Sequence, residues 1–227
     1  MKKYSHLFFD CDGVILNSNK IKTEAFHKIG LQFGESEAKK LVDYHLNNGG
    51  VSRYKKIIFF QKSIIMNADK KLYKKLVLDY GNNVKQDLLK TEISKGIFEI
   101  RKYFPRSNLS VVSGSDQNEL RWVFKKLGID NIFNIGIFGS PDSKEQILKN
   151  LFKKFNDYES GIFFGDSKYD YQVSKLFNLD FVFMSDWSDL TNWGEFIKEN
   201  KIKSNRNISE FLREFNSKFT NNTNINS

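Results

Sequence analysis

The sequence predicts an α/β protein, in which helices cover a parallel β-sheet and a second, all-helical unit is inserted near the N-terminal end. Five short segments are apolar on successive residues, as strands buried on both faces are. These segments are His6–Phe9, Leu109–Val112, Ile135–Phe138, Gly161–Phe164 and Phe181–Met184. Four of them end at a polar or glycine-containing turn, and ligands of open α/β sheets bind beyond such strand ends.

Helical patterns lie between these segments. The apolar residues of 117–127 recur at helical spacing before Gly128, a typical stop, and residues 144–155 show the same period. Residues 19–89 contain no clear buried strand and resemble several amphipathic helices. The patterns divide the chain into a core of residues 1–16 and 91–218, a helical unit of residues 17–90, and a polar tail of residues 219–227 that we expect to be disordered.

Composition excludes several classes of protein. The 227 residues are 40% hydrophobic and include 22 Phe, so the chain can bury a sizeable core and is not wholly disordered. No apolar run approaches the roughly 18 residues of a membrane-spanning helix, and the N-terminus lacks the pattern of a secretory signal. The single Cys residue permits no internal disulfide, so we expect a cytoplasmic protein without membrane contact.

The formal net charge of +9 raises the question of nucleic acid binding. The cations are mainly Lys, whereas nucleic acid surfaces favour Arg, so we expect no nucleic acid partner. Residues 17–90 hold 15 Lys and Arg against 7 Asp and Glu, a net of +8. This excess is either a solvated helical surface or a lid whose field attracts anionic substrates.

The first candidate site is Asp10-Cys11-Asp12, directly after the first apolar segment. Two carboxylates at this spacing can serve as nucleophile and general acid/base, although a polar strand end would look the same. A calcium loop is disfavoured because the later carboxylates and the closing Glu are missing. Cys11 is a rival nucleophile, but the Arg that would close a phosphate-binding loop is replaced by Asn17. A thiolate between two carboxylates is also disfavoured, so we interpret Cys11 as a packing residue.

The second candidate site follows the second apolar segment. Ser113 and Gly114 precede a helix start, where a hydroxyl and free backbone N–H groups can bind an anion. The alternative is an ordinary helix cap, in which Asp116 and Glu119 form a capping box.

Two further candidates follow the third and fourth apolar segments. Lys144 stands in the first turn of a helix, where a cation is mildly unfavourable unless it serves another purpose. It could equally be one of many surface lysines. Asp166 and Asp170 could hold a hard cation such as Mg²⁺, or could simply belong to an N-capped helix.

Taken in this order, the four motifs resemble those of the haloacid dehalogenase superfamily of phosphohydrolases, over about residues 3–187. The branch with phosphoglycolate phosphatase and β-phosphoglucomutase is the most similar. The resemblance implies a Rossmann-like core with a helical cap. It also implies Mg²⁺-dependent hydrolysis of a small phosphorylated metabolite, such as a sugar or polyol phosphate, through an aspartyl phosphate.

The resemblance also implies roles for individual residues. Asp10 would attack phosphorus, and Asp12 would protonate the leaving alcohol and then deprotonate the hydrolytic water. Ser113 and the Gly114 amide would hold the phosphoryl oxygens, and Lys144 would tie Asp10 to the phosphate.

The implied Mg²⁺ site consists of Asp10, the backbone carbonyl of Asp12, and Asp166. Asp170 would bind the ion directly or through water, or would orient its shell. The four acids would repel one another without compensation, and Mg²⁺ together with Lys144 would offset three of their charges.

The cap resemblance concerns the loop 48–53, which is similar to a substrate loop of the mutase branch. Arg53 could bind a carboxylate or a second phosphate of the substrate, or could lie on the surface behind a Ser52 helix cap. Lys22 stands where the mutase pattern has a His, which favours a phosphatase over the alternative, a phosphosugar mutase. A non-catalytic binding protein on this scaffold is a third hypothesis, which the full set of acids disfavours.

Overall fold

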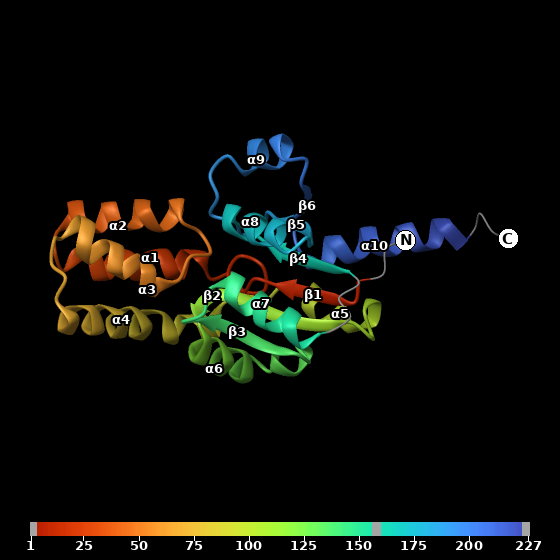
Figure 1. Cartoon of the computed structure of the whole chain (residues 1–227), viewed down its shortest axis with the longest axis horizontal. Helices are drawn as coiled ribbons and strands as arrows, with labels where there is room; N and C mark the ends of the chain where they lie inside the picture. Colours follow the sequence, from red (N-terminus) through yellow and green to blue (C-terminus); the bar gives the residue numbers. More distant parts are fainter. Residues whose placement is uncertain (1–3, 156–159, 224–227) are drawn as a thin grey trace.

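The computed structural model describes residues 4–155 and 160–223 and contains a six-stranded parallel sheet in the order β3-β2-β1-β4-β5-β6 (Figure 1). The strands are β1 (His6–Phe9), β2 (Asn108–Asp116), β3 (Gly136–Ser140), β4 (Gly161–Gly165), β5 (Asp180–Met184) and β6 (Lys203–Asn205). The predicted α/β class and all five apolar strands are confirmed. The sequence did not indicate β6, because it is a short polar strand at the edge of the sheet.

Helices cover both faces of this sheet. They are α5 (Gly96–Tyr103), α6 (Gln117–Leu127), α7 (Lys144–Lys154), α8 (Lys168–Leu176), α9 (Trp193–Glu199) and α10 (Ile208–Thr223), with short 3₁₀ turns at Asp87–Lys90 and Asp130–Ile132. Leu7 and Phe9 of β1 belong to one buried cluster with residues of α5, α6 and α10. Phe8 belongs to a second cluster with residues of α7 and α8. Successive strand residues therefore face opposite apolar layers, which explains the unbroken apolar segments.

The end of the chain differs from the prediction. α10 continues to Thr223, through the first five residues of the expected disordered tail, 219–227. Helix propagation explains this difference, because extending an existing helix costs less than starting one. Residues 224–227 lie outside the described residues.

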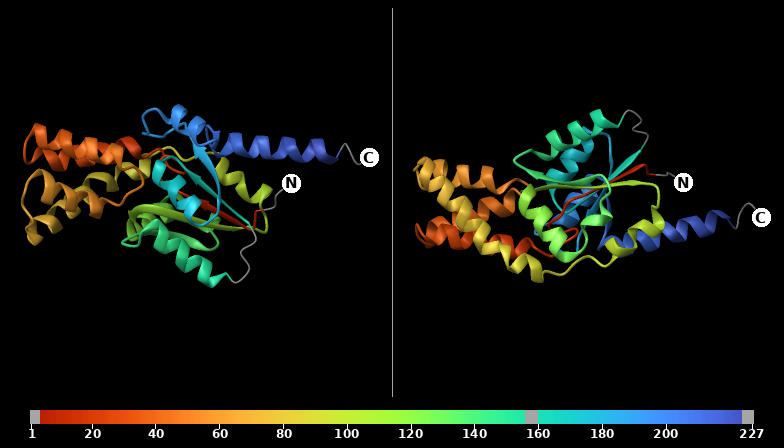
Figure 2. Two further views of the ribbon diagram at one scale, coloured as in Figure 1. Left: turned by 45° about the horizontal axis from the view of Figure 1, so that its top comes forward. Right: turned by 90° about the horizontal axis from the view of Figure 1, so that it is seen from below.

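The helical unit forms a cap at the end of the molecule opposite both termini (Figure 2). Its helices are α1 (Asn19–Leu31), α2 (Glu35–Asn47), α3 (Arg53–Phe59) and α4 (Lys70–Lys85), with a π turn at Phe60–Ile64. The buried cap residues Phe26, Ile57 and Leu76 belong to the same apolar cluster as Leu7 and Phe9. None of the helices in the described ranges is both long and apolar enough to cross a bilayer.

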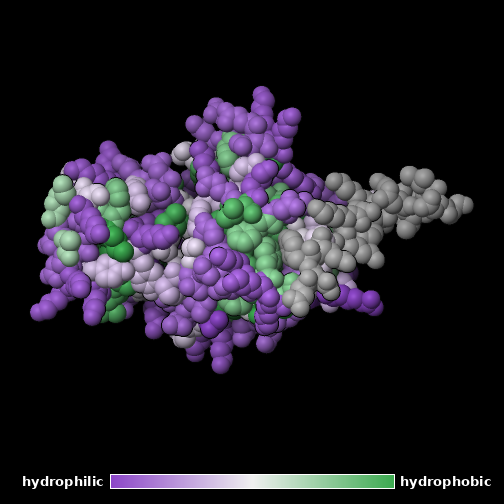
Figure 3. Space-filling model, in the orientation of Figure 1, coloured by the Kyte–Doolittle hydropathy of each residue, from purple (hydrophilic) through white to green (hydrophobic). Residues whose placement is uncertain are grey.

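Most of the cap's positive charge is solvated. Lysines 70, 71, 74 and 75 of α4 are exposed, and the face in Figure 3 is hydrophilic over much of its area. Lys22 and Lys56 are exceptions, because both are buried and turn toward the core. Most of the positive charge of the cap therefore belongs to a solvated helical surface, the first of the two interpretations of this charge. Two ammonium groups, those of Lys22 and Lys56, face the core instead.

Candidate active site

The carboxyl ends of β1, β2, β3 and β4 gather the four motifs on the side of the sheet that faces the cap (Figure 1). Asp10 follows β1 and is 2% exposed. Lys144, from the first turn of α7, places Nζ 2.9 Å from Asp10 Oδ2 and 2.5 Å from Asp170 Oδ1. One carboxylate oxygen from each of Asp10, Asp166 and Asp170 lies within 4.8 Å of the others. Residues that are up to 160 positions apart in the sequence thus form one buried charged cluster.

Burial and mutual repulsion dominate the electrostatics of this cluster. Burial, together with the charges of Asp170 and Asp12, raises the pKa of Asp10 to about 7, although Lys144 opposes the rise. The pKa of Asp166 is well above its ordinary value, first because of burial and then because of the Asp10 and Asp170 charges. Burial alone would lower the pKa of Lys144, but the carboxylates of Asp10 and Asp170 raise it instead. The cluster is therefore short of positive charge.

The donor set fits a hard divalent cation. Three buried carboxylates against one ammonium leave a deficit of two positive charges, and Mg²⁺ prefers oxygen ligands. Asp170 is the most engaged of the three acids, because its oxygens accept hydrogen bonds from Lys144 and from Ser167 Oγ at 2.6 Å. Ser167 also caps α8 in a capping box with Asp170, so the N-cap interpretation of this motif holds as well. Asp10 and Asp166 are left as the better-placed acids for a metal.

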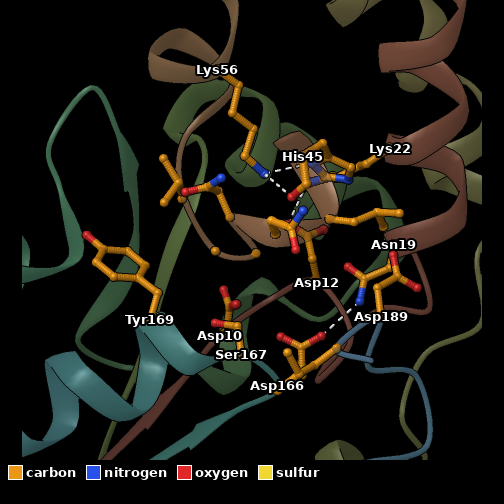
Figure 4. A pocket seen from close by; sticks show the side chains of 18 of the residues that line it. Asp10, Asp12, Asn19, Lys22, His45, Lys56, Asp166, Ser167, Tyr169 and Asp189 are labelled. Atoms are coloured by element: carbon orange, nitrogen blue, oxygen red, sulfur yellow. Dashed lines mark hydrogen bonds and ion pairs between the residues drawn. The ribbon is translucent and has the colours of Figure 1, made fainter. Parts of the chain in front are cut away.

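Asp12 turns away from this cluster and toward the cap (Figure 4). Its Oδ2 lies 2.5 Å from Lys22 Nζ and 2.7 Å from Ser115 Oγ, and its Oδ1 accepts a hydrogen bond from Ser18 Oγ. Burial alone would raise the pKa of Asp12, but Lys22 and the two hydroxyls lower it to about 2. Asp12 is therefore a carboxylate in this arrangement, paired with the residue that stands in place of the mutase His.

Gly114, near the carboxyl end of β2, lies where core and cap are in contact. A Cβ on Gly114 would overlap the backbone carbonyl oxygen of Gly50, so only glycine allows this approach. Gly114 and Ser115 line the cavity, whereas Ser113 is fully buried and accepts a hydrogen bond from Ser115 N at 3.1 Å. The role assigned to Ser113 stays a prediction. Asp116 caps α6 by accepting from Glu119 N, as the alternative interpretation expects, but the Glu119 carboxylate binds Arg53 instead of completing a capping box.

Arg53 is buried rather than on the surface, although Ser52 does cap α3. Both terminal nitrogens of Arg53 donate to the carboxylate of Glu119 on α6, one of them at 3.0 Å. The guanidinium also lies 4.7 Å from the centroid of the Tyr80 ring. Arg53 thus joins cap to core, and its predicted contact with substrate remains a prediction.

Cys11 is buried in the apolar cluster beneath Asp10 and Asp12. Burial, followed by the charge of Asp12, raises the pKa of its thiol well above the ordinary value. The interpretation of Cys11 as a packing residue agrees with both observations, because a nucleophilic cysteine needs a lowered pKa.

Core and cap enclose a cavity of about 300 Å³ (Figure 4). Asp10, Asp12 and Asp166 lie on its core side, and Lys22, His45 and Lys56 lie on its cap side. Sequence reasoning missed His45, Lys56 and Ser115 as cavity residues. The spacing of apolar residues predicts which face of a helix is buried. It does not predict which lysine or histidine near that face lines a cavity between the cap and the core.

The family model of the haloacid dehalogenase-like hydrolases matches residues 7–184. This chain belongs to that family. The family assignment made from the four motifs, including its hydrolase class, is therefore confirmed. No curated protein matches the sequence.

Solved structures of low sequence identity share the fold. A predicted phosphoglycolate phosphatase from Haemophilus somnus has a TM-score of 0.73 at 15% identity, covering 95% of this chain and 99% of its own. A candidate β-phosphoglucomutase from Bacteroides vulgatus has a TM-score of 0.70 at 15% identity, with coverages of 94% and 88%. A hydrolase candidate of this family from Bacillus subtilis, solved bound to magnesium, has a TM-score of 0.66 at 16% identity, with coverages of 95% and 100%.

Proposed function

We propose that this protein is a Mg²⁺-dependent phosphatase that hydrolyses small phosphate monoesters through an aspartyl phosphate. The observation that carries the proposal is that Asp10, which lies at the floor of the cavity beside a second carboxylate, Asp166, is paired with the buried Lys144 behind it. A divalent cation held by Asp10 and Asp166 would offset charge on the phosphoryl oxygens. The family match and the magnesium-bound structural relative support the same conclusion.

In the first step an oxygen of Asp10 attacks phosphorus, and the bond from phosphorus to the leaving alcohol oxygen breaks. The ammonium of Lys144, held by Asp10 and Asp170, neutralises charge on the transferring group. Asp12 donates the proton that the leaving alkoxide takes, so Asp12 must be protonated and released from Lys22 before this step, because the contact with Lys22 holds the pKa of Asp12 at about 2.

In the second step water attacks phosphorus of the aspartyl phosphate, and the bond between phosphorus and the Asp10 oxygen breaks. The Asp12 carboxylate takes the proton from the attacking water, which returns Asp12 to the protonated state from which the first step began. Inorganic phosphate leaves, and Asp10 is regenerated. Lys22, which stands where the mutase pattern has a His, favours this hydrolytic outcome over transfer to a second alcohol.

Phosphate release from p-nitrophenyl phosphate tests the proposal. We expect release in Mg²⁺, loss of release in EDTA, and a fall of at least about 10³-fold in Asp10→Asn. Asp43→Asn makes the same chemical change at an exposed position of α2 and should keep full activity. Mass spectrometry of acid-quenched enzyme should find phosphate on Asp10. An active Asp10→Asn protein, or turnover that persists in EDTA, would contradict the proposal.

A further inference from the structure

Four cationic side chains are buried in the described part of the chain, namely Lys22, Arg53, Lys56 and Lys144. Three of them have a carboxylate partner. Lys22 pairs with an aspartate beside the nucleophile, Arg53 pairs with a glutamate of α6, and Lys144 pairs with two aspartates. Lys56 differs, because no carboxylate oxygen of the described residues lies within 4.0 Å of its ammonium. Since an unpaired buried charge is costly, this exception points to a missing anion.

The ammonium of Lys56 is held in place by neutral groups. Lys56 Nζ lies 2.7 Å from His45 Nδ1 and 3.4 Å from the His45 carbonyl oxygen. The other ring nitrogen of His45 lies 3.1 Å from Thr23 Oγ1. Burial, then the charges of Lys56 and Lys22, lower the pKa of His45 well below its ordinary value, so the ring accepts from Lys56 as a neutral imidazole. Burial, then the charge of Lys22, also lowers the pKa of Lys56 to about 7, and an anion beside it would reverse that shift.

Lys56 reaches into the cavity from α3, on the side opposite Asp10 and Asp166 (Figure 4). A phosphoryl group attacked by Asp10 would direct its leaving group toward the cap, because Asp10 forms the floor on the core side. Asp189 lines the same cavity and its charge interacts with that of Lys56, but none of its oxygens lies within 4.0 Å of the Lys56 ammonium, and its side chain is hydrogen-bonded to Thr23. The leaving group of the substrate is therefore the part that would meet the ammonium of Lys56.

We propose that Lys56, positioned by His45, binds an anionic group on the leaving part of the substrate. The preferred substrates are then phosphate esters of acidic alcohols, whose second anion is a carboxylate or another phosphate. This inference rests on the proposed phosphatase function and names its substrate class. It assigns to Lys56 the role that the sequence suggested for Arg53, whose guanidinium is already engaged by Glu119.

Three esters and three variants test the inference. Glycerol 3-phosphate has a neutral leaving group, 3-phosphoglycerate adds a carboxylate, and propane-1,3-diol bisphosphate adds a second phosphate. For Lys56→Met, kcat/KM on the preferred anionic ester should fall about 10- to 100-fold relative to glycerol 3-phosphate. Lys56→Arg should recover part of that ratio. Lys55→Met removes the same charge at the exposed neighbouring position and should leave the ratio unchanged.

The two anionic esters distinguish a carboxylate from a phosphate as the second anion. A wild-type protein that hydrolyses p-nitrophenyl phosphate in Mg²⁺ but treats the three esters alike would overturn the inference and leave the proposed function standing. An unchanged ratio in Lys56→Met would also overturn it. Isothermal titration calorimetry can measure the affinity of each ester for two inactive proteins, the single variant Asp10→Asn and the double variant Asp10→Asn with Lys56→Met. This test needs no turnover. Equal affinities in the two proteins would refute a role for Lys56.

Discussion

Replacing the proposed nucleophile should stabilise the protein while it abolishes activity. Asp10 is buried among Asp12, Asp166 and Asp170 and faces one compensating ammonium, Lys144. In Asp10→Asn the amide oxygen can still accept the hydrogen bond from Cys11 N, at 2.7 Å in the parent protein. The substitution therefore removes a buried negative charge that Lys144 compensates only in part, and it keeps much of the local hydrogen bonding. We expect the metal-free variant to have a higher free energy of unfolding than the metal-free parent.

The pKa of Asp10 sets the size of the gain. The rise from 3.8 to about 7 corresponds to roughly 4 kcal/mol against the ionised form, at about 1.4 kcal/mol per unit. Because the folded pKa is the higher one, the penalty is absent below about pH 4, grows as pH rises, and is complete above about pH 7. The new amide nitrogen faces Lys144 and takes back part of the benefit. The expected gain is thus about 1 to 4 kcal/mol at pH 8 and less than half of that at pH 5.

Urea unfolding in EDTA at pH 5 and pH 8 measures this gain. Asp43→Asn, at an exposed position of α2, should change the free energy of unfolding by less than about 0.5 kcal/mol at either pH. Adding Mg²⁺ should then stabilise the parent more than Asp10→Asn, because the parent has the larger charge deficit. A variant less stable than the parent at pH 8, or a gain that is equal at the two pH values, would refute the electrostatic reasoning.

Two further substitutions probe the contact between cap and core. Gly114→Ala places a methyl group against the Gly50 carbonyl, so the cap loop must shift and kcat/KM should fall at least about tenfold. The control is Gly194→Ala, whose methyl group meets no atom and which should leave kcat/KM unchanged. Full activity in Gly114→Ala would show that catalysis does not need this contact. Arg53→Met leaves the Glu119 carboxylate buried and should lower the free energy of unfolding by about 3 kcal/mol in urea, with recovery when Glu119→Gln is added. A rise in KM without loss of stability would instead make Arg53 a substrate residue.

The core of the fold could be predicted because its strands have apolar layers on both sides. Phe8 and Phe9 face different helices, so both must be apolar, and that pattern is visible in the sequence. β6 escaped prediction because Lys203-Ser204-Asn205 is a polar edge strand that only its pairing with β5 defines. The end of α10 escaped because the polar composition of the tail does not show that a helix already formed can continue through it.

The core side of the site could be predicted for a related reason. Parallel strands end at one edge of a sheet, so polar residues that follow buried strands converge there whatever their distance in the sequence. The cap side has no such rule. Lys55 and Lys56 are adjacent and chemically identical, yet one is exposed and the other lies in the cavity. Only the packing of α3 against α2, α4 and β2 decides between them.

The cap lysines change the charge of the site rather than simply covering it. If all of them were charged, the four aspartates predicted from the motifs would carry four negative charges, and the buried lysines 22, 56 and 144 would offset three of them. With every group charged, the enclosed site would have a net charge of about −1 without ligands, and a divalent cation would make it about +1. A phosphate ester with a second anionic group carries three or four negative charges, so it would bind well only after that cation and only with Lys22 and Lys56 in place. The substitution of Lys for the mutase His at position 22 thus has a positive role, because it supplies one of the charges on which the retention of an acidic substrate depends.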